Sequence, residues 1–260
     1  MQHLFAPEGE AALAAVMASR PLLAFDFDGT LAPIVARPED ARVANALEQR
    51  LERLAQRLPL AIVSGRRVDD ILGRLSFAPH YVIGNHGAED PSAVGFAPSA
   101  LDGMRARLLA HGPAIEALGV AIEDKIYSIA LHYRLATDHA AAFRLITGLV
   151  DDLPPGLHAY GGKMVMNIVL AAAPNKADAV SSLVTRSGSQ SAVFAGDDLN
   201  DEPVFAAAPP DWLTIRIGHA ETPSQARFYL ESPDEVAVLF DRMLILLDDP
   251  ASPPGAVSIP

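Results

Sequence analysis

The chain of 260 residues contains no cysteine and few aromatic residues, with a single tryptophan among them. The absence of cysteine excludes disulfides, thiolate catalysis and cysteine-ligated zinc or iron sites. Any metal ion must therefore be held by oxygen or histidine ligands.

Basic residues are also scarce: 20 lysines and arginines stand against 32 acidic residues, which gives a formal net charge of −12. Nucleic acids and anionic membranes are polyanions that bind basic surfaces, so neither is expected as a partner. A small anionic substrate is still compatible with this composition, because a few well-placed lysines and arginines reverse the local field.

Long hydrophobic runs are missing as well. The apolar stretches are far shorter than the ~20 residues of a membrane-spanning helix, and the N-terminus lacks the basic-then-apolar pattern of a signal peptide. Half of the residues are apolar, which predicts a globular fold with a sizeable core. We expect a cytoplasmic protein, a monomer or weak homo-oligomer, with a flexible tail at 248–260, where proline and aspartate gather.

Strands and helices alternate in the first and last parts of the chain. The patterns predict strands at 22–27, 59–63, 80–84, 191–196, 213–217 and 226–230. They predict helices at about 40–57, 67–75, 175–186, 201–207 and 233–247. This alternation is typical of an α/β fold with a doubly wound, mostly parallel, Rossmann-like core sheet. The predicted core domain is discontinuous and comprises residues 1–98 and 174–247.

The middle of the chain follows a different order. It predicts a helix, two strands, a helix and two strands, at about 99–117, 120–125, 128–134, 138–151, 157–161 and 163–170. An αββαββ unit of this kind builds an antiparallel sheet with helices on one face, which predicts a smaller, inserted α+β cap domain over 99–173. Ligands of open α/β sheets bind beyond the carboxyl ends of the strands, so the active site is expected between core and cap.

Two carboxylates stand at the end of the first core strand. In an extended strand Asp26 and Asp28 point the same way. Two carboxylates so placed repel each other and lose hydration. A cation or a proton between them compensates for this cost, which favours a divalent metal site. The alternative is a simple turn, since turns prefer aspartate and glycine. A turn, however, does not require an aspartate at the position of Asp26. This residue lies one position inside the apolar run, where burial of a carboxylate is unfavourable.

Three further strand or helix ends carry polar residues. Ser64 follows the second strand, where it forms either part of a phosphate cradle or an ordinary helix cap. Asp197 and Asp198 follow a strand and a glycine, as metal ligands or as part of a solvated acidic loop. Lys176 begins a helix, where a cation opposes the helix dipole. We therefore expect an anion to compensate Lys176, with an exposed surface lysine as the alternative.

In combination, these segments resemble the haloacid-dehalogenase-type phosphatases, whose four motifs occur in the same order. They are Asp-x-Asp-Gly-Thr at 26–30, Ser-Gly-Arg at 64–66, the isolated Lys176 and Gly-Asp-Asp at 196–198. Finer details are similar to the trehalose-6-phosphate phosphatase family over roughly residues 20–245. These details are Asn-His-Gly-Ala-Glu at 85–89, His-Tyr-Arg at 132–134, Gly-Lys at 162–163 and Gly-Asp-Asp-x-x-Asp-Glu at 196–202.

The resemblance implies a Mg²⁺-dependent phosphatase that forms an aspartyl-phosphate. Asp26 would be the nucleophile and Asp28 the general acid and base, while Ser64 and Lys176 hold the phosphoryl oxygens. The implied metal ligands are Asp26, the backbone carbonyl of Asp28 and the acidic motif, with Asp197 as its first candidate and Asp198 and Asp201 as further ones.

The resemblance also implies that the substrate is a sugar phosphate, with trehalose 6-phosphate favoured, and that the cap binds its sugar. The implied substrate-binding residues are Gly65, Arg66, Asn85, His86, Gly87, Glu123, Lys125, His132, Arg134, Lys163 and Asn167. The cap members of this set could instead form the solvent face of an amphipathic sheet.

Three positions depart from the family pattern. Asn167 stands where the family usually has glutamate, Ala177 where it has glycine and Asn200 where it has threonine. The change at Asn167 leaves phosphates of sucrose, glucosylglycerol or a hexose open as substrates. A phosphomutase of the same superfamily is the alternative enzyme. A phosphoaspartate signalling module is the non-enzymatic alternative, but it would carry no cap and would place its acidic pair before the phosphorylated strand.

Overall fold

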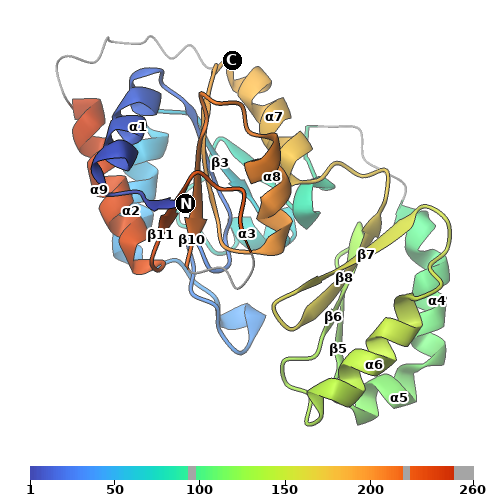
Figure 1. Ribbon diagram of the computed structural model, residues 1–260. Helices are drawn as coiled ribbons and strands as arrows, with labels where there is room; N and C mark the ends of the chain where they lie inside the picture. Colours follow the sequence, from blue (N-terminus) through green and yellow to red (C-terminus); the bar gives the residue numbers. More distant parts are fainter. Residues whose placement is uncertain (93–97, 219–222, 249–260) are drawn as a thin grey trace.

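The computed structural model describes residues 1–92, 98–218 and 223–248, and it contains two separate sheets (Figure 1). The larger sheet has the strand order β1-β11-β10-β9-β2-β3-β4, and each of its pairings is parallel. The smaller sheet has the order β5-β6-β8-β7 and is antiparallel. The predicted parallel core with an inserted α+β unit is confirmed. The predicted flexible tail lies, beyond residue 248, outside the described residues.

The core elements alternate as the sequence pattern indicates. The strands are β1 (Gln2–His3), β2 (Leu22–Phe25), β3 (Leu60–Val63), β4 (Tyr81–Ile83), β9 (Ala192–Gly196), β10 (Leu213–Ile217) and β11 (Phe228–Leu230). The helices are α1 (Pro7–Ala18), α2 (Asn45–Ala55), α3 (Val68–Leu72), α7 (Lys176–Ser187), α8 (Glu202–Ala207) and α9 (Asp234–Asp248). Short 3₁₀ turns are η1 (Pro38–Asp40), η2 (Asn85–Gly87) and η4 (Leu199–Asp201). The prediction placed nothing before residue 22, so β1 and α1 are additions.

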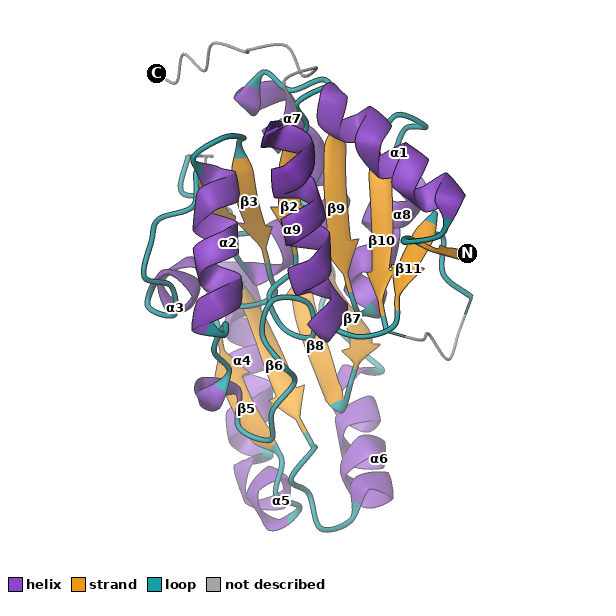
Figure 2. Ribbon diagram, turned by 90° about the vertical axis from the view of Figure 1, so that its left-hand side faces the viewer, coloured by secondary structure: helices purple, strands orange, loops and turns teal. Residues whose placement is uncertain are grey.

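Strands β2, β3 and β9 carry no polar side chain because helices cover both faces of the sheet. Leu23 and Phe25 pack in one hydrophobic cluster with residues of α1, α2 and α9, whereas Leu22 and Ala24 pack in another with residues of α7 and α8. This division follows the two-residue period of a strand. Figures 1 and 2 show the two helical layers on opposite sides of the sheet. The strand ends that carry the polar residues therefore rest on a rigid platform.

The cap lies between β4 and α7 in the chain. Its elements are η3 (Pro98–Leu101), α4 (Asp102–Ala110), α5 (Gly112–Ala117), β5 (Ala121–Asp124), β6 (Ser128–His132), α6 (His139–Val150), β7 (Leu157–Gly162) and β8 (Val165–Leu170). Helices α4, α5 and α6 cover one face of the small sheet, around a third hydrophobic cluster. The other face of this sheet turns toward the core domain (Figure 1). Side chains on that face can therefore reach a ligand held by the core.

Several predicted bounds differ from the structure, among them those of the helices expected at about 40–57 and 67–75, which span Asn45–Ala55 and Val68–Leu72. The single helix expected at 99–117 is divided into η3, α4 and α5, because Pro113 has no N–H to donate and its ring excludes the carbonyl of Leu109. The strand expected at 22–27 ends at Phe25, although the N–H of Asp26 still donates to the carbonyl of Ala195 at 2.9 Å. The chain then turns through Gly29, whose φ of +81° favours glycine.

Strand β2 lies at the point where the order of the parallel sheet reverses. From β2 the chain continues outward through β3 and β4 on one side, and β9, β10 and β11 extend on the other. Phe25 pairs with Ile62 of β3 and with Ala195 of β9, so the segments that follow these strands meet at one edge. Such a switch point is where doubly wound sheets bind ligands. Within the described ranges, no helix is long and apolar enough to cross a membrane.

Candidate active site

A narrow cavity of about 150 Å³ lies between the carboxyl edge of the core sheet and the cap. Most of the residues that the sequence proposes for the site line it. From the core these are Asp26, Asp28, Ser64, Gly65, Arg66, His86, Asp197 and Asp198; from the cap they are Glu123, Lys125, His132, Arg134, Lys163 and Asn167. The other four proposed residues, Asn85, Gly87, Lys176 and Asp201, do not belong to this lining.

Lys176 is buried against two carboxylates. Its Nζ donates to Oδ1 of Asp26 and to Oδ1 of Asp201, at 2.7 Å each, and its side chain is 1% exposed. The capping box of Asn175 and Asp178 satisfies the first backbone N–H groups of α7, which allows the lysine to start this helix. The expected anionic compensation is therefore present, and the surface-lysine alternative is excluded.

A group of three buried carboxylates could hold a metal ion. One oxygen from each of Asp26, Asp197 and Asp201 lies within 4.8 Å of the others. Burial raises the pKa of Asp26 well above its usual range, with Asp201 adding to the effect and Lys176 opposing it; burial likewise raises the pKa of Asp197 to about 6. Carboxylates that resist ionisation in this way gain from a bound cation. Hard oxygen donors suit a divalent ion such as Mg²⁺ or Ca²⁺.

The acidic motif divides between the metal group and the start of η4. Asp201 belongs to the group because η4 turns the chain back toward β9. Its Oδ1 accepts from Lys176, and its Oδ2 accepts from the N–H of Asp198 at 3.0 Å. The carboxylate of Asp198 instead accepts from the N–H of Leu199 at 2.8 Å and lies outside the group. Asp201, which the resemblance gives only as a further candidate, thus lies close enough to Asp26 and Asp197 to share a metal ion with them, whereas Asp198 does not.

The cap reaches this group through Lys163, in the turn between β7 and β8. Its Nζ lies 2.5 Å from Oδ2 of Asp197 and 3.3 Å from the carbonyl oxygen of the same residue. An ammonium group from the cap therefore binds one of the candidate metal ligands. The resemblance implies for Lys163 a role toward the sugar only.

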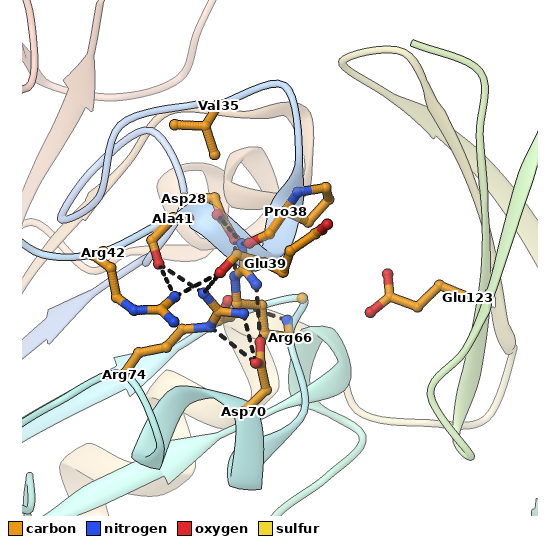
Figure 3. Close-up of polar contacts among 12 residues, drawn as sticks. Asp28, Val35, Pro38, Glu39, Ala41, Arg42, Arg66, Asp70, Arg74 and Glu123 are labelled. Carbon is orange, nitrogen blue, oxygen red and sulfur yellow. Dashed lines mark hydrogen bonds and ion pairs between the residues drawn. The ribbon is translucent and has the colours of Figure 1, made fainter. Parts of the chain in front are cut away.

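Asp28 has a separate cationic partner. Arg66 donates two hydrogen bonds of 2.7 Å to its carboxylate and a third, of 2.9 Å, to Asp70. Arg74 donates to Asp70 and to the carbonyl of Ala41, which ties α3 to the loop before α2 (Figure 3). Asp26 and Asp28 therefore have separate cationic partners, Lys176 and Arg66, and the side chain of Asp28 is not part of the group of three carboxylates. The four-residue spacing of Arg66, Asp70 and Arg74 was the signal for this network.

The loop after β3 forms a confined cradle. Ser64 is fully buried, and its Oγ accepts the N–H of Arg66 at 3.2 Å. A Cβ on Gly65 would lie 2.2 Å from the ring of His86, so only glycine fits there. From the cap, Lys125 donates to the carbonyl of Gly65 at 2.8 Å. Burial, together with Lys125 and Lys176, lowers the pKa of His86 well below its usual value, which keeps the imidazole neutral.

The polar cap residues line the cavity, with side chains that range from buried (Lys125) to about half exposed (Glu123, Lys163). Oε2 of Glu123 lies 2.9 Å from Nε2 of His132, and Figure 3 shows Glu123 directed from its cap strand toward the Arg66 network. Asn167 is buried, and its side chain contacts His86. Arg134 donates to the carbonyls of Val35 and Lys163. These groups provide donors and acceptors above the carboxylates.

Comparison with known proteins agrees with this arrangement. The family model for trehalose-phosphatase matches residues 24–95 and 107–234, which include every site residue named above. The chain belongs to the trehalose-phosphatase family. A trehalose-phosphate phosphatase of Mycobacterium tuberculosis is 30% identical over 261 residues, which cover 88% of this chain and 62% of the relative.

Longer proteins also contain this trehalose-phosphatase unit. An uncharacterized glycosyl hydrolase of Mycobacterium tuberculosis is 30% identical over 249 residues, which cover 86% of this chain but only 18% of the relative. The chain thus spans less than two thirds of the curated relatives that it matches. A crystal structure of a trehalose-6-phosphate phosphatase related protein superposes with a TM-score of 0.70 at 26% identity, covering 86% of this chain and 98% of the other.

Behind the cavity, Asn85 joins the two domains and Gly87 packs against the start of α7. Asn85 accepts from the hydroxyl of Ser128 in the cap and donates to Glu89 in the core, at 2.6 Å each. Gly87 has a φ of +117°, and a Cβ there would lie 2.5 Å from the carbonyl oxygen of Asn175. In the structure, both residues position the neighbouring His86 and the start of α7.

Proposed function

We propose that this chain is a Mg²⁺-dependent phosphatase of sugar phosphates, with trehalose 6-phosphate as the favoured substrate. The observation that carries the proposal is the buried group of Lys176 with Asp26 and Asp201, beside Asp197, at the switch point of a trehalose-phosphatase fold. The descriptions of the relatives support the choice of sugar. The cap residues on the opposite wall support a hydroxylated substrate.

The donor set suits Mg²⁺, which prefers a few carboxylates and retained waters. Asp26, Asp197 and Asp201 would hold the ion, with the backbone carbonyl of Asp28 as a further ligand. When bound, it supplies positive charge that offsets the substrate phosphate and favours ionised carboxylates. Without such charge, a buried carboxylate and a phosphate dianion repel each other.

In the first step, a carboxylate oxygen of Asp26 attacks phosphorus and the bond from phosphorus to the sugar oxygen breaks. Asp28 gives its proton to that departing oxygen. Lys176 and Ser64 hold phosphoryl oxygens as charge develops on them. The product of this step is an aspartyl-phosphate on Asp26 and a neutral sugar.

In the second step, water attacks the phosphorus of the aspartyl-phosphate and gives a proton to Asp28. The bond from phosphorus to Asp26 breaks, which releases inorganic phosphate and restores both aspartates. Splitting the hydrolysis into two displacements allows each to be aligned in turn. Arg66 keeps the Asp28 carboxylate directed at the cavity through both steps.

The proposal is tested by a phosphate-release assay with Mg²⁺ on the phosphates of trehalose, sucrose, glucosylglycerol and glucose. We expect the highest kcat/KM for trehalose 6-phosphate and no release by Asp26→Asn, which keeps the shape of the side chain but removes the nucleophile. Failure to release phosphate from any of these compounds would contradict the proposal. Conversion of a hexose phosphate to its isomer without phosphate release would instead indicate a phosphomutase.

A further inference from the structure

A second cavity, of about 610 Å³, lies behind the catalytic one. Its walls come from β7 and β8 of the cap, from the segment 171–175 that joins the cap to α7, and from the region of η4. His86 and Asn200 line both cavities, so the two share a wall. The volume falls within the roughly 300–1,000 Å³ of small-molecule sites. Of the groups assigned to the proposed reaction, Lys176 borders this space, with its ammonium bound to Asp26 and Asp201.

Aromatic rings form one side of the second cavity. His158 and Tyr160 are alternate residues of β7 and present their rings on one face, with centroids 6.2 Å apart and an angle of 28° between the planes. The ring of His86 meets that of Tyr160 at 83°, with centroids 5.6 Å apart. His158 is exposed and Tyr160 is half-buried. Such a surface packs well against the C–H face of a flat, partly apolar ligand.

Polar atoms without partners occur in the same wall. The hydroxyl of Tyr160 and Oδ1 of Asn200 are buried, and neither has a hydrogen-bond partner in the part of the chain that the structure describes. Buried polar atoms are normally paired, so a ligand hydroxyl that turns either side chain into the cavity would supply the missing partner. A tyrosine hydroxyl and an amide oxygen both suit the hydroxyl groups of a ligand.

The second cavity offers no charge to an ionised ligand. Apart from its histidines, Lys176 is the only cationic residue that lines it, and the ammonium is bound by Asp26 and Asp201. His86 is neutral, as described above. A ligand with an apolar ring face, several hydroxyls and no charge is a neutral saccharide.

We propose that the second cavity binds a neutral sugar, the class of product that the proposed reaction releases. The choice of ligand rests on the proposed function, whereas the site itself rests on His158, Tyr160 and Asn200. A sugar held there lies against His86, which also lines the catalytic cavity. Accumulated product therefore slows turnover without occupying the place of the substrate.

Calorimetric titration of the full chain with trehalose and with glucose, in saturating phosphate and Mg²⁺, tests the binding site. We expect at least one of the two sugars to bind while phosphate occupies the catalytic cavity. Tyr160→Phe removes one hydrogen bond and should weaken binding about fivefold. His158→Ala should weaken it further, whereas His111→Ala, an exposed cap histidine that lines neither cavity, should leave it unchanged. Absence of binding, or equal affinity in all three variants, would overturn the proposal.

Inhibition kinetics locate the sugar independently. In the wild type the added neutral sugar should lower kcat, and His158→Ala should keep the uninhibited rate but lose this inhibition. Inhibition that acts on KM only, persists in His158→Ala and is lost in Glu123→Gln would place the sugar in the catalytic cavity and overturn the proposal. If no sugar phosphate is hydrolysed, the proposed function fails, and the calorimetric result still decides whether the second cavity binds a sugar.

Discussion

Asp26 and Asp28 stand two positions apart, yet their surroundings differ. The side chain of Asp26 is 7% exposed and is bound to Lys176, whereas that of Asp28 is 41% exposed and is bound to Arg66. A sequestered carboxylate suits attack on phosphorus, because water does not compete for it. An accessible carboxylate suits exchange of a proton with the sugar oxygen and with water. The two proposed roles are consistent with these two different environments.

Replacing Arg66 with lysine tests whether Arg66 orients Asp28. Lysine keeps the charge but cannot form the two parallel hydrogen bonds of the guanidinium group. We expect kcat to fall on the order of tenfold to a hundredfold, because a misplaced general acid loses part of its effect, while KM changes little. The steady-state rates of sugar-phosphate hydrolysis measure both quantities.

Arg67→Lys is the matched control, since Arg67 is the next residue and makes only an exposed ion pair with Asp69. Its kcat should equal that of the wild type. A normal kcat in Arg66→Lys, or a change confined to KM, would show that Asp28 does not depend on this pair.

His86 should make the stability of the fold depend on pH. Its folded-state pKa is held well below 6.5 by burial and by two lysines, so below about pH 6.5 the unfolded chain binds a proton that the folded chain does not. The free energy of unfolding therefore decreases as the pH falls below 6.5, by up to about 1.4 kcal/mol per pH unit from this residue. Urea unfolding at pH 6.5 and pH 5 measures the loss.

The comparison variant is His86→Asn, because asparagine tolerates the left-handed φ of 59° at this position. Other titrating groups are common to both proteins, so the difference between their losses isolates His86. The variant should lose about 1–2 kcal/mol less between the two pH values. An equal loss in both proteins would mean that His86 is protonated in the folded state.

Among the elements, the turn between β7 and β8 acts on the metal group from the cap. Lys163 binds Asp197 and therefore competes with any cation for that carboxylate. In Lys163→Met we expect Mg²⁺ to bind about threefold more tightly, a modest factor because the side chain of Lys163 is 47% exposed. The rise of the unfolding midpoint with Mg²⁺ concentration measures the affinity.

Arg144→Met controls for the loss of one positive charge, since Arg144 lies exposed on α6. The Mg²⁺ dependence of its unfolding should match that of the wild type. A Lys163→Met protein with unchanged or weaker Mg²⁺ affinity would show that the ammonium does not compete with the metal.

The ends of elements were the most predictable part of the site. Asp26, Ser64 and Asp197 each follow a buried apolar strand, so their convergence follows from the parallel topology alone. The role of Asp201 was less predictable, because it depends on how η4 turns the chain back. Pro113 indicates the break between α4 and α5, whereas the apolar pattern continues across it and predicts a single helix.

At the scale of the whole molecule, the order of the helices and strands predicted a parallel core and an inserted cap, with the active site between them. The contacts between the two domains could not be predicted, because they join residues far apart in the chain. They include Lys125 with the carbonyl of Gly65 and Arg134 with that of Val35. The cap thereby contacts the loop after β3, and under the proposed function the sugar phosphate lies between Asp26 and the cap.

The central claim, that Asp26 carries the phosphoryl group, is tested most directly by acid quenching during turnover of trehalose 6-phosphate, followed by mass spectrometry of the peptides. The account predicts a phosphate adduct on the peptide that contains Asp26, located to that side chain, and its absence from Asp26→Asn. Phosphate release by the wild type with the adduct on another residue, or undiminished release by Asp26→Asn, would contradict it.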